Sequence, residues 1–200
     1  MRRGVLVLGA CGALFLRPPM AVAHLVTTGL GPVYDGVSHL LLTFDDLLPV
    51  VAMALLAGLN GPTAGRRALF TLPGAWLVAG VVGYVSGVVR VPGGATAVSL
   101  LALGILTAAD LKLAPGVVTA LALLLGIAHG LLNGAGLAVA GREASGLVGI
   151  TGAIFVLVAV VAARVVSLQQ PWIRIAARVA GSWIAAIGLL LLGWTLSGRL

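Results

Sequence analysis

Hydrophobic residues form six long runs along the chain, separated by short breaks rich in glycine, proline and charged residues. Runs of about 20 apolar residues are long enough to cross the hydrocarbon core of a bilayer as helices. The runs lie near residues 38–59, 68–89, 95–112, 116–140, 147–166 and 176–196. The pattern predicts an all-α fold, a polytopic bundle of six transmembrane helices. Because the breaks are short, neighbouring helices should run antiparallel.

The first 23 residues have the order of a secretory signal peptide. A positively charged start is followed by a thirteen-residue apolar core, a proline break and an Ala-Val-Ala sequence that ends at Ala23. This order predicts a cleaved signal peptide over residues 1–23 and a single transmembrane helical domain over residues 24–200. An uncleaved first helix is the alternative, although the apolar core is short for a span. Cleavage after Ala23 would leave the mature N-terminus, His24, outside.

Composition supports a membrane protein and argues against other classes. Hydrophobic residues make up 60% of the chain, charged residues only 8%, and the mean hydropathy is +1.19. Soluble domains carry about a quarter charged residues, so this chain cannot cover a water-facing surface and should have the lipid bilayer as its partner. The net charge is +7, but no basic cluster with interleaved aromatic residues indicates nucleic acid.

The cations of the breaks predict an orientation in the inner membrane. With the mature N-terminus outside, six of these cations fall on the inner side and three on the outer side. The inner set is Arg66, Arg67, Lys112, Arg164, Arg174 and Arg178. The outer set is Arg90, Arg142 and Arg199. This excess on the inner side agrees with the positive-inside rule.

Polar residues recur on one face at the start of the first apolar run. Positions three, four and seven apart share a helix face, so Thr43 and Asp46 should lie on the same face as His39. Asp35 joins this face if the helix begins early, whereas Asp45 points roughly a third of a turn away. The pattern predicts an imidazole, a hydroxyl and one or two carboxylates together on a single helix.

A second polar group lies in the fourth apolar run. His129 and Asn133 are four residues apart and share a helix face. Gly126, Gly130 and Gly134 follow at four-residue intervals, a spacing that lets another helix approach closely. Because two histidines on separate helices can meet in the core of a bundle, we expect the two polar groups to converge.

The chemistry of the two groups favours a metal site. A charged side chain at the bilayer centre costs about 2.5–3.5 kcal/mol and is therefore a candidate for function. Imidazole with carboxylate is a common ligand set for divalent first-row metals. The main candidate ligands are His39, Asp45, Asp46, His129 and Asn133. The secondary candidates are His24, Asp35 and Thr43. The structural alternative is that the histidines bond across helices and the glycines only pack.

The two motifs resemble those of the HupE/UreJ family, nickel permeases associated with hydrogenase and urease. That family combines a cleaved signal peptide, about six spans, an HxxxxxDH motif in the first span and a later FHGxxHGxE motif. The positions that match are His39, Asp45, His129, Gly130 and Gly134. The order, spacing and placement of the motifs agree over most of the chain.

Three positions depart from the family pattern. Asp46 stands where the first motif has its second histidine, Asn133 where the later motif has its second histidine, and Gly136 where that motif has glutamate. Replacing imidazole by carboxylate and amide moves the ligand set toward oxygen and toward harder cations.

The resemblance implies a secondary permease that carries a divalent transition-metal cation, nickel or cobalt, across the inner membrane. The metal would be the substrate, and no organic cofactor is expected. The chain has no nucleotide-binding loop, and we do not expect an enzyme. Two alternatives stay open: a non-transporting accessory subunit for metalloenzyme maturation, and a bis-histidine haem membrane protein. Partners beyond lipid and cation would be a second copy of the chain or metalloenzyme accessory proteins.

Overall fold

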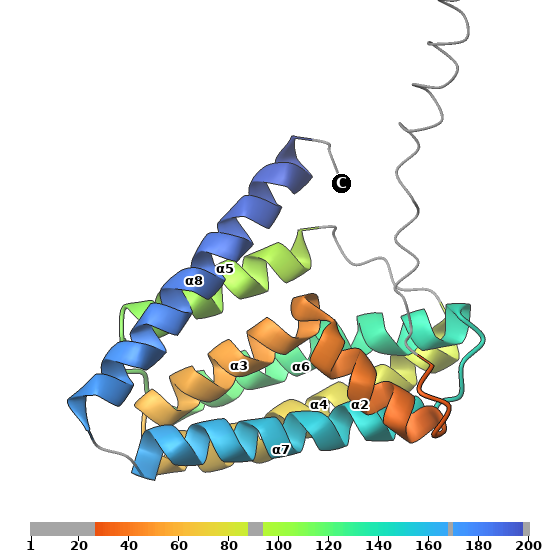
Figure 1. Cartoon of the computed structure of the whole chain (residues 1–200), viewed down its shortest axis with the longest axis horizontal. Helices are drawn as coiled ribbons and strands as arrows, with labels where there is room; N and C mark the ends of the chain where they lie inside the picture. The colour runs from red at the N-terminus through yellow and green to blue at the C-terminus, as the bar shows by residue number, and fades with distance from the viewer. Residues whose placement is uncertain (1–26, 88–93, 168–169, 198–200) are drawn as a thin grey trace, which may run out of the picture.

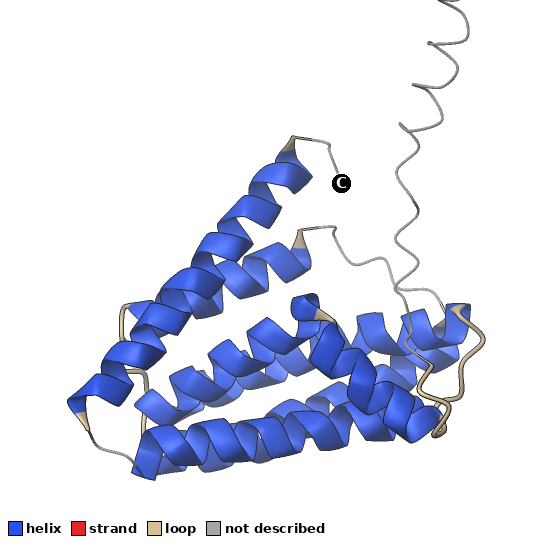
Figure 2. Cartoon of the chain, in the orientation of Figure 1, coloured by secondary structure: helices blue, strands red, loops and turns tan. Residues whose placement is uncertain are grey.

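The computed structural model describes residues 27–87, 94–167 and 170–197, and within these ranges it contains helices and no strands (Figures 1 and 2). The helices are α2 (Pro32–Leu42), α3 (Phe44–Leu59), α4 (Pro62–Ser86), α5 (Ala95–Ala108), α6 (Pro115–Val139), α7 (Gly146–Ser167) and α8 (Pro171–Leu196). The predicted signal peptide and His24 lie outside the described residues. The prediction of an all-α fold is confirmed.

Helix length separates the elements that can cross a bilayer from those that cannot do so alone. Four helices, α4, α6, α7 and α8, are long and apolar enough to span a membrane. The adjoining pair α2 and α3 would make a fifth span if it is taken as one broken element. At 14 residues, α5 is about 21 Å long, shorter than a hydrocarbon core of about 30 Å. Helix lengths therefore support a polytopic membrane protein but do not confirm six spans.

The first predicted span is not one helix. The chain bends by 75° between α2 and α3, so the expectation of a continuous helix that carries His39 and Asp46 on one face is wrong. The break falls at Thr43, whose backbone is extended, with φ −96° and ψ 97°. The Thr43 N–H donates to the His39 carbonyl and closes α2, while its own carbonyl accepts the N–H groups of Asp46 and Leu47 and opens α3.

The break suits the charges on either side of it. Asp45 and Asp46 occupy the first turn of α3, where the partial positive charge of a helix N-terminus stabilises carboxylates. His39 occupies the last turn of α2, where the partial negative charge favours a side chain that donates hydrogen bonds. Two helix ends of opposite polarity therefore face the same region of the bundle.

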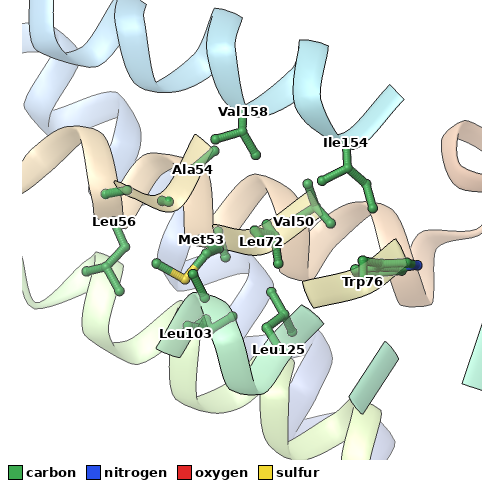
Figure 3. Close-up of a cluster of buried hydrophobic side chains, with 14 of the residues drawn as sticks. Val50, Met53, Ala54, Leu56, Leu72, Trp76, Leu103, Leu125, Ile154 and Val158 are labelled. Atoms are coloured by element: carbon green, nitrogen blue, oxygen red, sulfur yellow. The ribbon is translucent and has the colours of Figure 1, made fainter. Parts of the chain in front are cut away.

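The helix α3 runs through the middle of the bundle, and its Val50, Met53 and Leu56 are fully buried. Apolar side chains from four other helices surround it (Figure 3). These are Leu72 and Trp76 of α4, Leu103 of α5, Leu125 of α6, and Ile154 and Val158 of α7. Because α3 is enclosed in this way, Asp46 in its first turn is also held inside the protein.

Glycines let α4 and α6 pack with their backbones in contact. A methyl group added to Gly134 of α6 would overlap the carbonyl oxygen of Gly80, and one added to Gly130 would overlap the carbonyl of Trp76. Gly83 of α4 faces the backbone of Leu131 in the same way. Small residues at a helix interface are the usual means of close packing in lipid, where helices gain little from the hydrophobic effect.

The helices α5 and α8 form a second closely packed pair. Gly104 of α5 meets the backbone of Ala185, and Gly188 of α8 meets the backbone of Leu101. Figure 1 shows this pair leaning away from α4, α6 and α7, with α3 between the two groups. Thr107 of α5 joins the pair to α3, because its hydroxyl lies 3.3 Å from the Ala52 carbonyl.

Polar contacts fasten the end of the bundle at which α3 and α5 finish and α6 and α8 begin. Arg174 of α8 donates to both carboxylate oxygens of Asp110, and Arg178 donates to the Ala108 carbonyl. Lys112 donates to the Leu59 carbonyl at 3.1 Å. The two arginines therefore join α8 to the end of α5, and Lys112 joins the connection after α5 to the end of α3.

The close contact of α4 and α6 predicts a contrast between two glycines of one helix. Gly134→Ala should lower the stability of the protein in detergent by about 1–3 kcal/mol, because the new methyl group has no space. Gly136→Ala is the matched control, since nothing lies within 4 Å of a methyl group there. Thermal unfolding followed by circular dichroism measures both. Equal stability of the two variants would contradict this packing.

Candidate functional site

The break between α2 and α3 directs His39 toward Asp46. The His39 Nε2 lies 3.6 Å from the Asp46 Oδ2, and both residues are buried. This distance is longer than a direct hydrogen bond. On the other side of the ring, the Thr43 hydroxyl lies 3.4 Å from the His39 Nδ1. The extended residue at the break therefore also contacts the imidazole that it positions.

Asp46 is the centre of the site. Its Oδ1 lies 2.8 Å from the His129 Nδ1, an ordinary hydrogen-bond distance. Its Oδ2 accepts a hydrogen bond from the Asn133 amide at 2.9 Å. One carboxylate therefore joins α2, α3 and α6, and these three helices bring together four of the predicted ligands.

Two further helices complete the surroundings of His129. The Ser99 hydroxyl of α5 lies 3.1 Å from the His129 Nε2, so both ring nitrogens have partners. The Trp76 indole of α4 packs on the imidazole, with ring centroids 5.4 Å apart and planes inclined by 32°. Since His129 is only 2% exposed, these contacts fix the ring without help from bulk water.

Neither Ser99 nor Trp76 was identified from the sequence. Ser99 lies in an apolar run without a neighbouring polar motif, and Trp76 is one of several aromatic residues in the spans. Their relevance comes from the packing of α4 and α5 around His129. A sequence pattern can place residues on one helix face but cannot say which face of another helix it meets.

Of the other predicted ligands among the described residues, Thr43 contacts the His39 ring, whereas Asp45 and Asp35 do not join the site. Asp45 is exposed, as expected for a residue that points away from the face of Asp46. Asp35 lies seven residues before the end of α2, where it accepts hydrogen bonds from the Thr28 amide and hydroxyl at 2.6 and 2.7 Å. The Asp35 carboxylate also lies 3.6 Å from the Arg142 guanidinium. Asp35 therefore belongs to a separate polar group.

Asp35 and Arg142 border a cavity of about 240 Å³ at the end of the bundle where α2 and α7 begin and α6 ends. Its lining includes the charged residues Asp35, Arg142 and Glu143 as well as Gly36 and Leu137. Gly36 is one turn before His39 on α2, and Leu137 is one turn after Asn133 on α6. The cavity therefore lies about one helical turn from the two residues, His39 and Asn133, that approach Asp46.

Two polar atoms of residues that contact His129 or Asp46 have no hydrogen-bond partner. The Asn133 Oδ1 and the Trp76 Nε1 are buried and make no hydrogen bond. Buried polar atoms are usually satisfied, so these two mark places where a bound ligand or water fits. Among the described residues, no group of three or more histidine, cysteine, aspartate and glutamate side chains is placed to hold a metal ion. A complete coordination shell would therefore need amide, hydroxyl, backbone or water oxygens.

The fold and the site together define an all-helical membrane protein with a buried carboxylate between two imidazoles and an amide. The chain belongs to the HupE / UreJ protein family, because the model of that family matches residues 12–191. The family is associated with nickel or cobalt transport or with accessory functions for hydrogenase and urease, and it is not known for enzymes. No curated protein and no solved structure matched the chain.

The position of Asp46 predicts a difference in stability between two adjacent carboxylates. Asp46→Ala leaves the His129 Nδ1 and the Asn133 amide without their partner, and each unsatisfied buried group costs about 1–3 kcal/mol. Asp45→Ala should change stability by no more than about 0.5 kcal/mol, because Asp45 is exposed. Thermal unfolding of both variants in one detergent compares them. A larger loss for Asp45→Ala would contradict the arrangement.

Proposed function

We propose that this chain is a permease that carries a divalent transition-metal cation, nickel or cobalt, across the inner membrane. The cation is the substrate, and Asp46 binds it together with His39, His129 and Asn133. The observation that carries the proposal is the buried Asp46 carboxylate, which two imidazoles and an amide approach from α2 and α6. A carboxylate in this setting is costly unless a cation or proton compensates it.

Interatomic distances around Asp46 support cation binding. Two ligands about 2.1 Å from one ion lie roughly 3.0–3.4 Å apart for octahedral to tetrahedral angles. The His39 Nε2 lies 3.6 Å from the Asp46 Oδ2, close to this spacing, whereas the Asn133 Nδ2 at 2.9 Å is a hydrogen-bond donor and not a ligand. Rotation of the Asn133 amide would turn its unpartnered Oδ1 toward the same position. Small movements of these side chains would therefore create a ligand set of nitrogen and oxygen.

The break at Thr43 gives the site a way to change. Transporters place substrates at discontinuous helices, whose free ends contribute charge and backbone ligands. Here the end of α2 carries His39 and the start of α3 carries Asp46, so a change in the 75° angle between them alters the distance between two ligands. Release of the cation would follow such a change, while the glycine-packed α4 and α6 keep His129 and Asn133 together.

The distribution of lysine and arginine side chains supports the proposed orientation. The residues expected on the inner side belong to the ends of α5 and α7 and the starts of α4 and α8. Residues from α3, α4, α7 and α8 line one cavity at this end, and α5 contacts α8 there through Asp110 and Arg174. We propose that this end faces the cytoplasm, in a topology of six spans that counts α2 with α3 as one span and includes the short α5.

Uptake measurements test the proposal directly. Cells that produce the His39→Ala, His129→Ala double variant should lose uptake of the cognate cation, since both imidazoles at Asp46 are removed. Glu143→Ala is the control, because Glu143 is an exposed carboxylate of a connection. Radiolabelled nickel and cobalt provide the measurement, and elemental analysis of purified protein identifies the bound metal. Uptake by the double variant at the wild-type rate would refute the site.

A non-transporting accessory subunit is the second candidate. The observation that favours it is the departure from the family motifs at Asp46, Asn133 and Gly136, which removes nitrogen and carboxylate ligands. The described residues also hold no complete set of strong ligands. Co-purification with metalloenzyme maturation proteins, without cation uptake by the wild-type chain, would favour this function over transport.

The haem alternative predicts a spectrum that the proposed site should not give. Asp46 contacts both histidines, at 3.6 and 2.8 Å, and a porphyrin between the imidazoles would have to displace it. Purified protein from haem-supplemented cells should therefore show no Soret band. A Soret band that disappears in His129→Ala would replace the permease proposal with a haem protein.

A further inference from the structure

Ser99 makes a contact with His129 that has a defined direction. Its Oγ lies 2.8 Å from the Thr96 carbonyl and 3.1 Å from the His129 Nε2. A serine hydroxyl has one proton to donate and two lone pairs that accept. When that proton goes to the Thr96 carbonyl of its own helix, the oxygen accepts the N–H of the His129 Nε2. In this arrangement Ser99 is the hydrogen-bond acceptor at the ring nitrogen that faces away from Asp46.

We propose that Ser99 is the positioning residue that keeps the His129 Nδ1 directed at the cation site, an inference that rests on the proposed function. A histidine that binds a metal through one ring nitrogen usually donates its other N–H to an oxygen. Ser99 supplies that oxygen, and Nδ1 is left to face Asp46. Ser99 acts through His129 and does not itself touch the cation.

Packing around the imidazole explains why this hydroxyl is needed. Trp76 covers the face of the ring and limits its tilt, but a flat contact does not distinguish the two edges of an imidazole. Rotation of the ring by half a turn would exchange nitrogen for carbon at Asp46. The Ser99 oxygen at Nε2, together with the Asp46 carboxylate at Nδ1, opposes that rotation, because both buried ring nitrogens would lose their partners.

The contact also connects the site to the α5–α8 pair. Ser99 belongs to α5, which packs mainly against α8 and α3. The carboxylate, both histidines and the amide belong to α2, α3 and α6. A displacement of α5 together with α8 would therefore move the Ser99 oxygen away from the His129 Nε2. The ring would then be less firmly oriented with its Nδ1 toward Asp46. The position of this helix pair thus influences cation affinity through the Ser99 hydroxyl.

Three substitutions in the purified full-length protein test the role of Ser99. Ser99→Ala should lower the equilibrium affinity for Ni²⁺ or Co²⁺ by about 10- to 100-fold, the usual effect of removing a partner of a metal-binding histidine. Ser99→Thr keeps the hydroxyl and should retain affinity close to that of the wild type. Ser182→Ala is the matched control, since Ser182 lies on α8 and donates only to the Arg178 carbonyl of its own helix. Isothermal titration calorimetry measures all three.

A second measurement does not depend on metal binding. In protein labelled with ¹⁵N-histidine, the ring-nitrogen resonances of His129, assigned by their loss in His129→Ala, should shift in Ser99→Ala and stay unchanged in Ser182→Ala. Wild-type affinity in Ser99→Ala, or equal losses in Ser99→Ala and Ser99→Thr, would overturn the positioning role. If the wild-type protein binds neither cation, the proposed function fails, and unchanged ring resonances in Ser99→Ala would overturn the Ser99 contact separately.

Discussion

The structure depends on one buried carboxylate and the groups that compensate it. Asp46 receives His129 on one oxygen and Asn133 on the other, with His39 close by. Each of these partners comes from a helix that must approach α3 closely, so the electrostatic requirement of one side chain constrains the packing of the bundle. An isolated carboxylate could not remain charged in an apolar interior of this kind.

The glycines of α4 and α6 satisfy part of that constraint. Gly130 and Gly134 bring the backbone of α6 against α4, which places Trp76 over the ring of His129 and leaves Asn133 facing α3. The residues that make close packing possible therefore alternate along α6 with the residues that carry chemistry. In this motif the glycines set the distance between α6 and α4, and His129 and Asn133 make the contacts that this distance allows.

The departures from the family pattern also have a spatial relation. Asp46 and Asn133 each replace a histidine of the family motifs, and their side chains hydrogen-bond to each other at 2.9 Å. A carboxylate only accepts hydrogen bonds and the Asn133 amide donates one to it, whereas two imidazoles at these positions would present different donors and acceptors. The two positions that depart from the motifs the chain resembles are therefore in contact with each other.

The sequence by itself determined the membrane class, the helical fold and the shared face of His129 and Asn133, because hydropathy and helical periodicity are local properties of the chain. It also identified His39 and Asp46 and predicted that the two polar groups converge, although the single continuous helix predicted for His39 and Asp46 was wrong. Tertiary structure alone decided the break at Thr43, the separation of Asp35 from the site, and the roles of Ser99 and Trp76. These features depend on which helices pack together and at what angle, and such contacts between distant segments leave no periodic pattern in the sequence.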